Sequence, residues 1–578
     1  MTLPSVTNSE ARAQTTLVVP NASGGEPSAG RFDVFLVAVA SAALSIISLV
    51  YYFRHGELLL YGDAVAHINI ARRIFDSLTP GFGQLGTVWL PLPHLLIAPF
   101  IVNHAMWRSG IGAAIPSMTA YVLGAVGIYR LTRRTLKNAQ ATESVARLGG
   151  FLAAALFAAN PSLIYLQTTA MNEPLYLALF VWALVWLQEF WLRAGAQRQN
   201  AENPARGPLL RSGLLLCGAE LTRYEGWVVA ALCAVIVVGI FAARRQLRAQ
   251  KRSLIAFLLM VVAAPLFWLG YNKILFGNAL EFATGPYSAY AIEHRGAGGG
   301  PLHPGDHDLK VATSYYAQAV LGDLGETWRR RHLLWLAAAG VALLLATRRG
   351  SLLLLLWAPL PFYVYSVAYG SIPIFVPNLS PWSYYNARYG TALLPAIAVF
   401  TAICAALLVA WAPWRWMKVA VVGLAVAIAG TVYASAYLEP QRFRAYAPGE
   451  PRRGPLVWRE AVVNSVSRIA FEQELARELQ KLPGDSRLLM YAAAHVGALQ
   501  TVGIPLRHVI TEANHDWWER ARANPGMSAD FIIAIEDDSV AQAVEGNPLG
   551  LQLMVEIRSP GQPLARIYRS LLSRHASH

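Results

Sequence analysis

Long apolar stretches that recur from residue 33 to residue 437 are the feature that most constrains the fold of this chain. The first of them, residues 33–53, is close to the ~20 residues needed to cross ~30 Å of hydrocarbon. The 578 residues are 55% hydrophobic and only 14% charged, which is more apolar surface than one soluble core can bury. We therefore expect a polytopic α-helical membrane protein.

The first apolar run is predicted to be a retained span and not a signal peptide. The segment before it, residues 1–30, is rich in Ser, Thr, Gly, Ala and Pro, whereas a signal peptide starts with a short basic segment. No small-residue cleavage site stands out behind the run. Residues 1–30 have the composition of a disordered tail.

Short clusters of basic residues between the apolar runs predict how the chain is oriented. The net charge of +14 is not arranged as a continuous stripe, so no nucleic-acid partner is expected. Lys and Arg in short loops favour the cytoplasmic side of a membrane. The clusters that mark inner loops are Arg130, Arg133, Arg134 and Lys137; Arg193, Arg198, Arg206 and Arg211; Arg244, Arg245, Arg248, Lys251 and Arg252; Arg348 and Arg349; and Arg415 and Lys418.

This placement predicts about eleven spans, with the N-terminus in the cytoplasm and the C-terminus outside. The spans are expected near residues 33–53, 113–131, 147–166, 174–193, 208–222, 226–243, 253–275, 332–347, 352–370, 390–411 and 418–437. One feature resists the rule, because Arg329, Arg330 and Arg331 would lie outside, just before the span at 332–347. The transmembrane module covers residues 31–437, with outer loops at 54–112 and 276–331.

Segment 89–107 is apolar but carries Pro91, Pro93 and Pro99. Counting it as a span would move the basic cluster at 130–137 to the outside. Prolines in its first turns would start a helix, and Pro99 would kink it. We interpret the segment as an interfacial or re-entrant helix, with a full span as the alternative.

The C-terminal part, residues 438–578, has charges of both signs and no run long enough to span a membrane. Residues 466–481 have the pattern of an amphipathic helix, and residues 487–493, 531–536 and 551–557 have the pattern of strands. A small α/β extracytoplasmic domain is expected.

Asp63 and His67 are the first candidates for chemistry. If the first outer loop forms a helix on the membrane, the two side chains share one face at positions i and i+4. A carboxylate beside an imidazole can act as a general base, or the pair can hold a divalent cation. The alternative is an Asp that caps its own helix, with His67 as a surface residue.

Three further ionisable residues are predicted at the outer ends of spans. Glu173 lies in a turn too short to be a solvated loop, and its simpler interpretation is a helix-start carboxylate followed by Pro174. Arg223 and Glu225 lie between two apolar runs, where a charge is costly unless it is paired or faces a cavity. We expect an ion pair that also lines a cavity.

An arginine among aromatic residues precedes the span at 390–411. Tyr385, Asn386, Arg388 and Tyr389 lie close together there. A guanidinium offers a rigid fork of donors that suits a phosphate at the headgroup level. The alternative is an ordinary interfacial anchor, for which Tyr and Trp are equally expected.

A second metal-binding group is conceivable in the outer loop 276–331. His303, Asp306, His307 and Asp308 lie within six residues of one another. Their spacing matches no recognised ligand pattern, so we expect no metal site there.

The order of these residues resembles that of the GT-C class of membrane glycosyltransferases, which includes the protein O-mannosyltransferases and the lipid A aminoarabinose transferase. The resemblance covers the alternation of spans through residue 437 and the outer C-terminal domain. The motifs that carry it are Asp63 in the first outer loop, Pro91–His94, Glu173 before the fourth span, and Arg388 and Tyr389 before Leu393–Pro395.

The resemblance implies a glycosyltransferase that moves a hexose or pentose from a polyprenyl-phosphate donor to an acceptor at the outer face, with inversion. It implies that Asp63 is the catalytic base, that Glu173 supports it and that Arg388 steadies the leaving phosphate. The substrate-binding candidates are His67, Arg72, Arg223, Glu225, Tyr385, Asn386, Arg388 and Tyr389.

Cofactor, acceptor and membrane are less sharply implied. No cofactor is certain, and a divalent cation, Mg²⁺ or Mn²⁺, held by Asp63 and His67 is left open. The acceptor is not identified, and a bacterial inner membrane is the expected location.

A multi-span transporter or lipid flippase is the alternative function. Such proteins also carry charges within many spans, and they often show internal repeats and broken helices near the midplane. The sequence shows no convincing repeat, and its candidate residues gather at one face.

Overall fold

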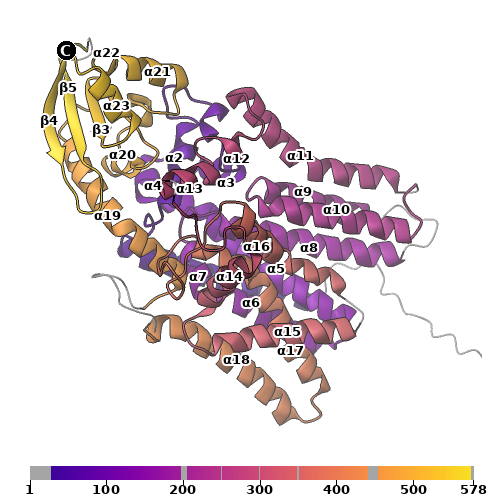
Figure 1. Cartoon of the computed structure of the whole chain (residues 1–578). Coiled ribbons are helices and arrows are strands. Elements are labelled where there is room, and N and C mark those ends of the chain that lie inside the picture. The colour runs from indigo at the N-terminus through magenta and orange to yellow at the C-terminus, as the bar shows by residue number, and fades with distance from the viewer. Residues whose placement is uncertain are drawn as a thin grey trace, which may run out of the picture.

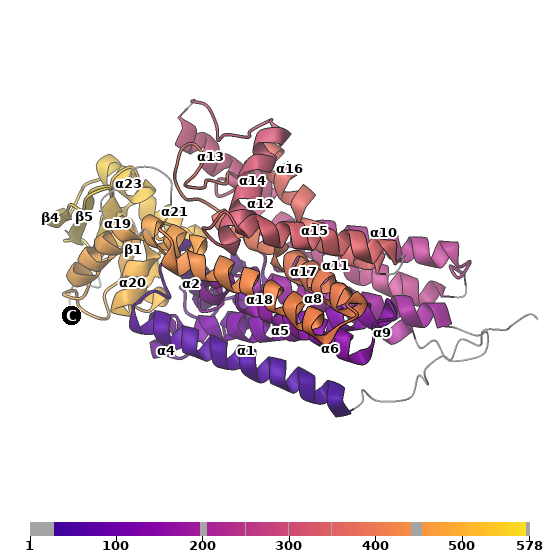
Figure 2. The same cartoon turned by 90° about the horizontal axis from the view of Figure 1, so that it is seen from below.

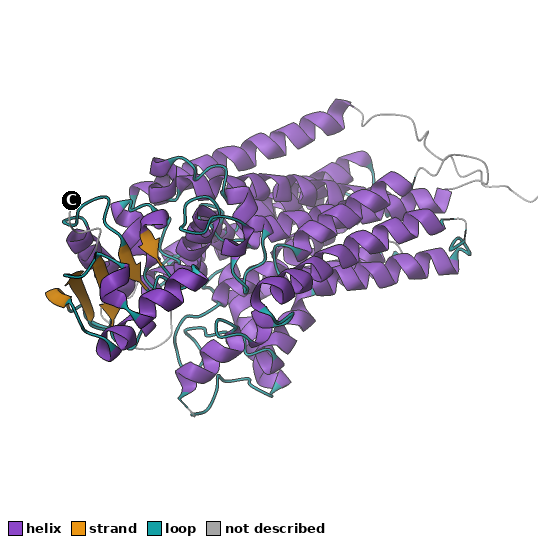
Figure 3. Cartoon of the chain, turned by 90° about the horizontal axis from the view of Figure 1, so that it is seen from above, coloured by secondary structure: helices purple, strands orange, loops and turns teal. Residues whose placement is uncertain are grey.

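The computed structural model describes residues 28–196, 205–248, 250–298, 300–347, 350–440 and 453–573. Most of the predicted tail, residues 1–27, and the cluster residues Arg198, Arg348 and Arg349 lie outside the described residues. A bundle of long helices makes up most of the molecule, and the strands gather at one end of it (Figures 1 and 3).

Eight helices among the described residues are long and apolar enough to cross a membrane. Two of them begin with a 3-10 turn that continues into an α-helix. The eight are α1 (Ser28–Arg54), α5 (Ile111–Asn138), α8 (Glu173–Ala196), α10 (Glu225–Ala243), α11 (Lys251–Phe276), η2 with α16 (Ser351–Trp357 and Pro359–Tyr369), η3 with α17 (Ala387–Leu393 and Leu394–Trp411), and α18 (Arg415–Leu438). Helix α1 runs along the edge of the bundle (Figure 2).

The other three predicted spans coincide with shorter helices. These are α6 (Glu143–Ala158), α9 (Arg206–Glu220) and α15 (Arg330–Ala346), of 16, 15 and 17 residues. At a rise of ~1.5 Å per residue each reaches only ~22–26 Å. They pack against longer helices, α6 against α5 and α17, α9 against α8 and α11, and α15 against α17. The helical membrane fold is therefore as predicted, with eight helices of full span length.

Residues 54–112, predicted to be the first outer loop and called by that name below, fold into short helices. Helix α2 (Gly62–Arg73) is followed by η1 (Phe82–Leu85), α3 (Leu92–Ile97) and α4 (His104–Ser109). Helices α3 and α4 have six residues each, or ~9 Å, so segment 89–107 does not cross as one helix. Further along the chain lie α7 (Pro161–Leu166), α12 (Glu281–Thr284), α13 (Ala289–Ala297) and α14 (Leu309–Leu324).

The C-terminal part forms the predicted α/β unit. Its sheet has the order β2-β1-β3-β5-β4, in which β1 runs parallel to β2 and β3, and β5 runs antiparallel to β3 and β4. The strands are β1 (Leu488–Met490), β2 (Val509–Ile510), β3 (Phe531–Ile535), β4 (Leu551–Ile557) and β5 (Ala565–Ser570). The helices are α19 (Leu456–Leu479), α20 (Val496–Val502), η4 (Leu506–His508), α21 (His515–Ala523), α22 (Pro525–Ser528) and α23 (Ser539–Gly546).

The predicted strands coincide with β1, β3 and β4, whereas β2 and β5 were not predicted. The predicted helix 466–481 begins ten residues earlier, at Leu456. These first turns of α19 join the C-terminal unit to the first outer loop, because the Tyr61 hydroxyl donates to the Val457 carbonyl at 2.9 Å. Trp458 Nε1 donates to Glu57 Oε2 at 3.0 Å. The two regions also share one hydrophobic core, so they position each other.

Close packing of α15 on α17 holds the short helix in the bundle. Gly340 of α15 lies directly against the backbone of α17, where a Cβ would be 1.9 Å from the Phe400 carbonyl oxygen. A glycine at this point lets the helix backbones approach, which is how small residues stabilise membrane helix pairs.

We therefore expect Gly340→Ala to destabilise the protein by about 1–3 kcal/mol, since the added methyl group must push the helices apart. The measurement is the thermal unfolding midpoint of the purified protein in detergent. Gly430→Ala in α18 is the matched control, because no described atom lies within 4 Å of a Cβ there. Equal midpoints for the two variants would contradict close packing of α15 on α17.

Candidate active site

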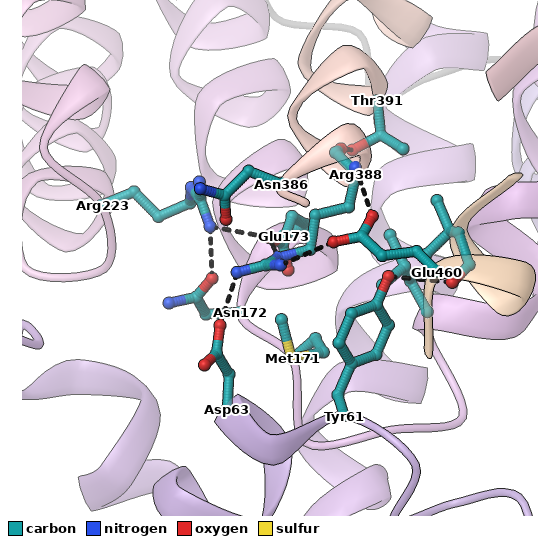
Figure 4. Close-up of polar contacts among 12 residues, drawn as sticks. Tyr61, Asp63, Met171, Asn172, Glu173, Arg223, Asn386, Arg388, Thr391 and Glu460 are labelled. Atoms are coloured by element: carbon teal, nitrogen blue, oxygen red, sulfur yellow. Dashed lines mark hydrogen bonds and ion pairs between the residues drawn. The ribbon is translucent and has the colours of Figure 1, made fainter. Parts of the chain in front are cut away.

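An ion pair joins the first outer loop to the start of α17. Asp63 lies in the first turn of α2, and Arg388 lies in η3. Arg388 Nη2 donates to Asp63 Oδ2 at 2.5 Å (Figure 4). The Arg388 side chain is 8% exposed, whereas that of Asp63 is 39% exposed. Asp63 is thus the side of the pair that a ligand can reach.

Two further carboxylates hold the same guanidinium. Arg388 Nε donates to Glu173 Oε1 at 3.2 Å, and Nη1 donates to Glu460 Oε1 at 3.3 Å. The backbone N–H of Arg388 also donates to Glu460 Oε2, at 3.2 Å. The three carboxylates come from α2, α8 and α19, so they fix Arg388 from three directions.

A second arginine is linked to the first through Glu173. Arg223 Nη1 donates to Glu173 Oε1 at 2.9 Å and to Asn172 Oδ1 at 2.6 Å. Arg223 Nε donates to Glu225 Oε1 at 2.5 Å, which confirms the predicted ion pair. Tyr363 completes the set by accepting from Arg223 Nη2 at 2.9 Å.

Aromatic rings fill the space around the two arginines. The Tyr389 ring lies 5.1 Å from the guanidinium carbon of Arg223 and 5.1 Å from that of Arg388. The Tyr61 ring lies 5.3 Å from Arg388. A small pocket beside them is lined by Glu173, Tyr176, Leu177, Arg223, Glu225, Tyr363, Tyr389, Thr391 and Ala392.

The cluster carries more acid than base. Its two guanidinium groups face four carboxylates, those of Asp63, Glu173, Glu225 and Glu460, which is a formal charge of −2 if all are ionised. Burial raises the pKa of Glu460, against the lowering effect of Arg388.

The predicted pairing of Asp63 with His67 is wrong. His67 is buried, its Nδ1 lies 2.9 Å from His94 Nε2, and its ring packs against Trp89. Burial lowers the pKa of His67 to about 3, so the ring is neutral. The i, i+4 spacing placed the two side chains on one helix, but a residue of α3 supplied the partner of His67.

Arg72 was also assigned wrongly to the site. Its Nε donates to Asp76 Oδ2 at 2.8 Å, and its Nη1 donates to the Ile101 carbonyl at 2.6 Å. The guanidinium lies over the Trp107 ring. Arg72 therefore links the end of α2 to the segment between α3 and α4.

Tyr385 and Asn386 lie at the edge of the site. The backbone of Tyr385 forms an antiparallel bridge with Phe375, and its ring is exposed. Asn386 is buried with a φ of 53°, and its Nδ2 donates to the Pro373 carbonyl at 2.9 Å. Asn386 shapes the turn before Arg388, and only Tyr385 is open to a ligand.

The residues considered for metal binding do not converge. Within the described part of the chain, no group of three or more His, Cys, Asp and Glu side chains is placed to hold a metal ion. Asp63 and His67 do not fit a divalent cation, since each is engaged by a different partner. In the outer loop, His303 contacts Glu293 and the Val367 carbonyl, and Asp308 caps α14.

Glu460 is the carboxylate of the site that sequence reasoning missed, along with Asn172 and Tyr363, the neutral partners of Arg223. Glu460 follows Arg459 at the start of α19, among Leu456, Val457, Ala461 and Val462. Two adjacent charges in an otherwise apolar run are the available signal, because such charges are paired when they are buried. Arg459 indeed contacts Glu326, and the Arg459 side chain is fully buried.

Known structures match the chain in fold. No protein-family model matches the sequence, and no curated protein matches it. ArnT from Cupriavidus metallidurans bound to undecaprenyl phosphate is 14% identical, with a TM-score of 0.53 over 95% of this chain and 99% of that chain. The apo state of that protein is also 14% identical, with a TM-score of 0.53 over 93% of this chain and 98% of that chain. The Archaeoglobus fulgidus oligosaccharyltransferase in complex with Zn and sulfate is 11% identical, with a TM-score of 0.46 over 93% and 73%. The predicted resemblance is confirmed at the level of architecture, and the chain has the fold of the GT-C membrane glycosyltransferases.

Proposed function

We propose that this protein is a glycosyltransferase that moves a sugar from a polyprenyl-phosphate donor to an acceptor hydroxyl at the outer face of the membrane. The fold alone does not fix a reaction, so the proposal rests on the site. The observation that carries it is the contact between Asp63, an accessible carboxylate, and Arg388, a buried cation suited to phosphate.

The phosphate of the sugar donor and the Asp63 carboxylate compete for the same hydrogen-bonding group, Arg388 Nη2. A phosphate oxygen that binds Arg388 Nη2 takes the place of Asp63 Oδ2. A carboxylate bound to a guanidinium is a poor proton acceptor, because its charge is already neutralised. Binding of the donor therefore frees Asp63 to act as a base at the moment when the sugar is in place.

The transfer then follows an inverting displacement. Asp63 accepts the proton of the acceptor hydroxyl, and the acceptor oxygen forms a bond to the anomeric carbon. The bond from that carbon to the phosphate oxygen breaks, and its electron pair stays on the phosphate. The leaving phosphate gains one negative charge, which Arg388 stabilises from a water-poor position. Glu173 pairs with both Arg388 and Arg223 and so fixes their positions relative to each other.

The arrangement supports a transferase over a transporter. The ionisable groups of the site lie at the ends of helices, in the first turns of α2, α8 and α10 and in η3. Transporters hold their substrates near the midplane, at broken helices. We assign the site to the extracytoplasmic face of a bacterial inner membrane, on the strength of the basic clusters in the opposite loops.

Replacement of the base tests the proposed reaction. Asp63→Asn keeps the shape but cannot accept a proton, so we expect turnover to fall by about 10²–10⁴-fold. The measurement is release of polyprenyl phosphate from a radiolabelled polyprenyl-phosphate sugar by purified protein. Asp485→Asn, at an exposed turn before β1, is the control and should retain full turnover. Equal turnover in Asp63→Asn and wild type would exclude Asp63 as the base.

Replacement of the phosphate ligand tests a different step. Arg388→Lys keeps the positive charge but loses the fork that contacts three carboxylates, so kcat should fall by about 10²-fold or more. Arg329→Lys, at an exposed position before α15, is the matched control with unchanged kcat. A kcat for Arg388→Lys within twofold of wild type would show that charge alone suffices, contrary to the proposed geometry.

Cysteine labelling tests the orientation. The three native cysteines, Cys217, Cys233 and Cys404, are free thiols and are replaced first. We then expect a membrane-impermeant maleimide to label Glu519→Cys in intact cells, and to label Gln140→Cys only after permeabilisation. Both positions are exposed in the structure. The reverse pattern would place the site in the cytoplasm.

A further inference from the structure

The helix that follows the last span brings a carboxylate into the site. Glu460 lies in the second turn of α19, and its side chain is 1% exposed. Helix α19 is 24 residues long and packs against α20 and β4 of the C-terminal unit. Figure 4 shows Glu460 approaching Arg388 from the side opposite Asp63.

Glu460 accepts hydrogen bonds from both the backbone N–H and the guanidinium of Arg388. Its Oε2 accepts from the Arg388 N–H at 3.2 Å, and its Oε1 accepts from Nη1 at 3.3 Å. In the next peptide group of the chain, the Arg388 carbonyl accepts from the Thr391 hydroxyl at 2.7 Å. The main chain of Arg388 is thus held at its N–H and at its carbonyl.

Neighbouring contacts keep Glu460 in register. One position before it, Arg459 contacts Glu326, which follows α14. Three positions before it, the Val457 carbonyl accepts from Tyr61, two residues before Asp63. Helix α19 is therefore anchored to the membrane bundle and to the loop that carries the base.

We propose that Glu460 is a positioning residue that aims Arg388 at the leaving phosphate, so that the C-terminal unit completes the active site. This inference rests on the proposed function. When the donor phosphate displaces Asp63, the guanidinium keeps its contacts with Glu460 and Glu173. Nη2 then remains pointed at the opening, where the phosphate lies.

The expected effect is on turnover more than on donor binding. Before reaction the donor phosphate carries one negative charge, and it gains a second as the sugar leaves. A misdirected guanidinium therefore costs more in the transition state than in the ground state.

Kinetics of full-length variants test this role. In Glu460→Gln the amide nitrogen faces Arg388 Nη1 as a second donor, so the guanidinium shifts. We expect kcat to fall by about 10–100-fold, the range typical of residues that orient a functional group, while the donor KM changes by less than about threefold. Glu460→Asp keeps the negative charge, so its kcat should exceed that of Glu460→Gln by about threefold or more.

The control is a second glutamate of the same helix. Glu478→Gln is used in place of Glu472, whose partner Arg468 also donates to the Leu59 and Leu60 carbonyls before Asp63. Glu478 pairs with Lys481 at 2.6 Å and lies about five turns away from Glu460. Its kcat and KM should stay within twofold of wild type. The thermal unfolding midpoints of all variants are measured in the same detergent, so that loss of folded protein is separated from loss of turnover.

The outcomes separate this inference from the proposed function. No release of polyprenyl phosphate by wild type would overturn both. Wild-type turnover with Glu460→Gln unchanged would overturn the role of Glu460 and leave the function standing. A fall in kcat that Glu460→Asp does not relieve, or that Glu478→Gln shares, would also overturn it, because the effect would then not depend on the carboxylate at position 460.

Discussion

The Arg388 guanidinium is the group on which the arrangement of the site depends. It is bound by carboxylates from residues 63, 173 and 460, which are far apart in the sequence. A buried cation without such partners would cost several kcal/mol, so the three segments stabilise one another by meeting at it. The first outer loop, the membrane bundle and the C-terminal unit are thereby joined at one point.

The three carboxylates differ in exposure, and the difference assigns their roles. Glu173 and Glu460 are buried, and each makes a second contact, with Arg223 and with the Arg388 backbone. Asp63 is the exposed one and contacts Arg388 through a single oxygen. A ligand phosphate that enters from solvent or lipid meets Asp63 first. We therefore expect Glu173 and Glu460 to hold Arg388 in place, while a phosphate replaces Asp63.

Much of this site could be predicted from the sequence, and the rest could not for a physical reason. Asp63, Glu173, Arg223 and Arg388 were found because charges at the ends of apolar runs are costly and rarely accidental. The partners of a charge are a different matter, since they depend on which distant segments pack together. His67 was paired with Asp63 by helix spacing, whereas the fold supplied His94 from α3. Likewise, the apolar runs predicted eleven spans, whereas eight helices of the described residues are long enough to cross a membrane. The other three runs form the shorter helices α6, α9 and α15, which pack against longer neighbours.

The position of Asp63 depends on contacts made at the other end of its own helix. Asn69 of α2 donates to Gln500 of α20 at 2.7 Å and accepts from Trp107 at 3.1 Å. Arg72, in the last turn, is fixed to Asp76 and to the segment after α3. A helix of 12 residues is too short to be stable by itself, so its direction is set by these contacts. The C-terminal unit therefore acts on Asp63, the proposed base, through α2 and on Arg388, the proposed phosphate ligand, through α19. A change in its docking would move both halves of the Asp63–Arg388 pair, which is why we regard it as part of the catalytic structure.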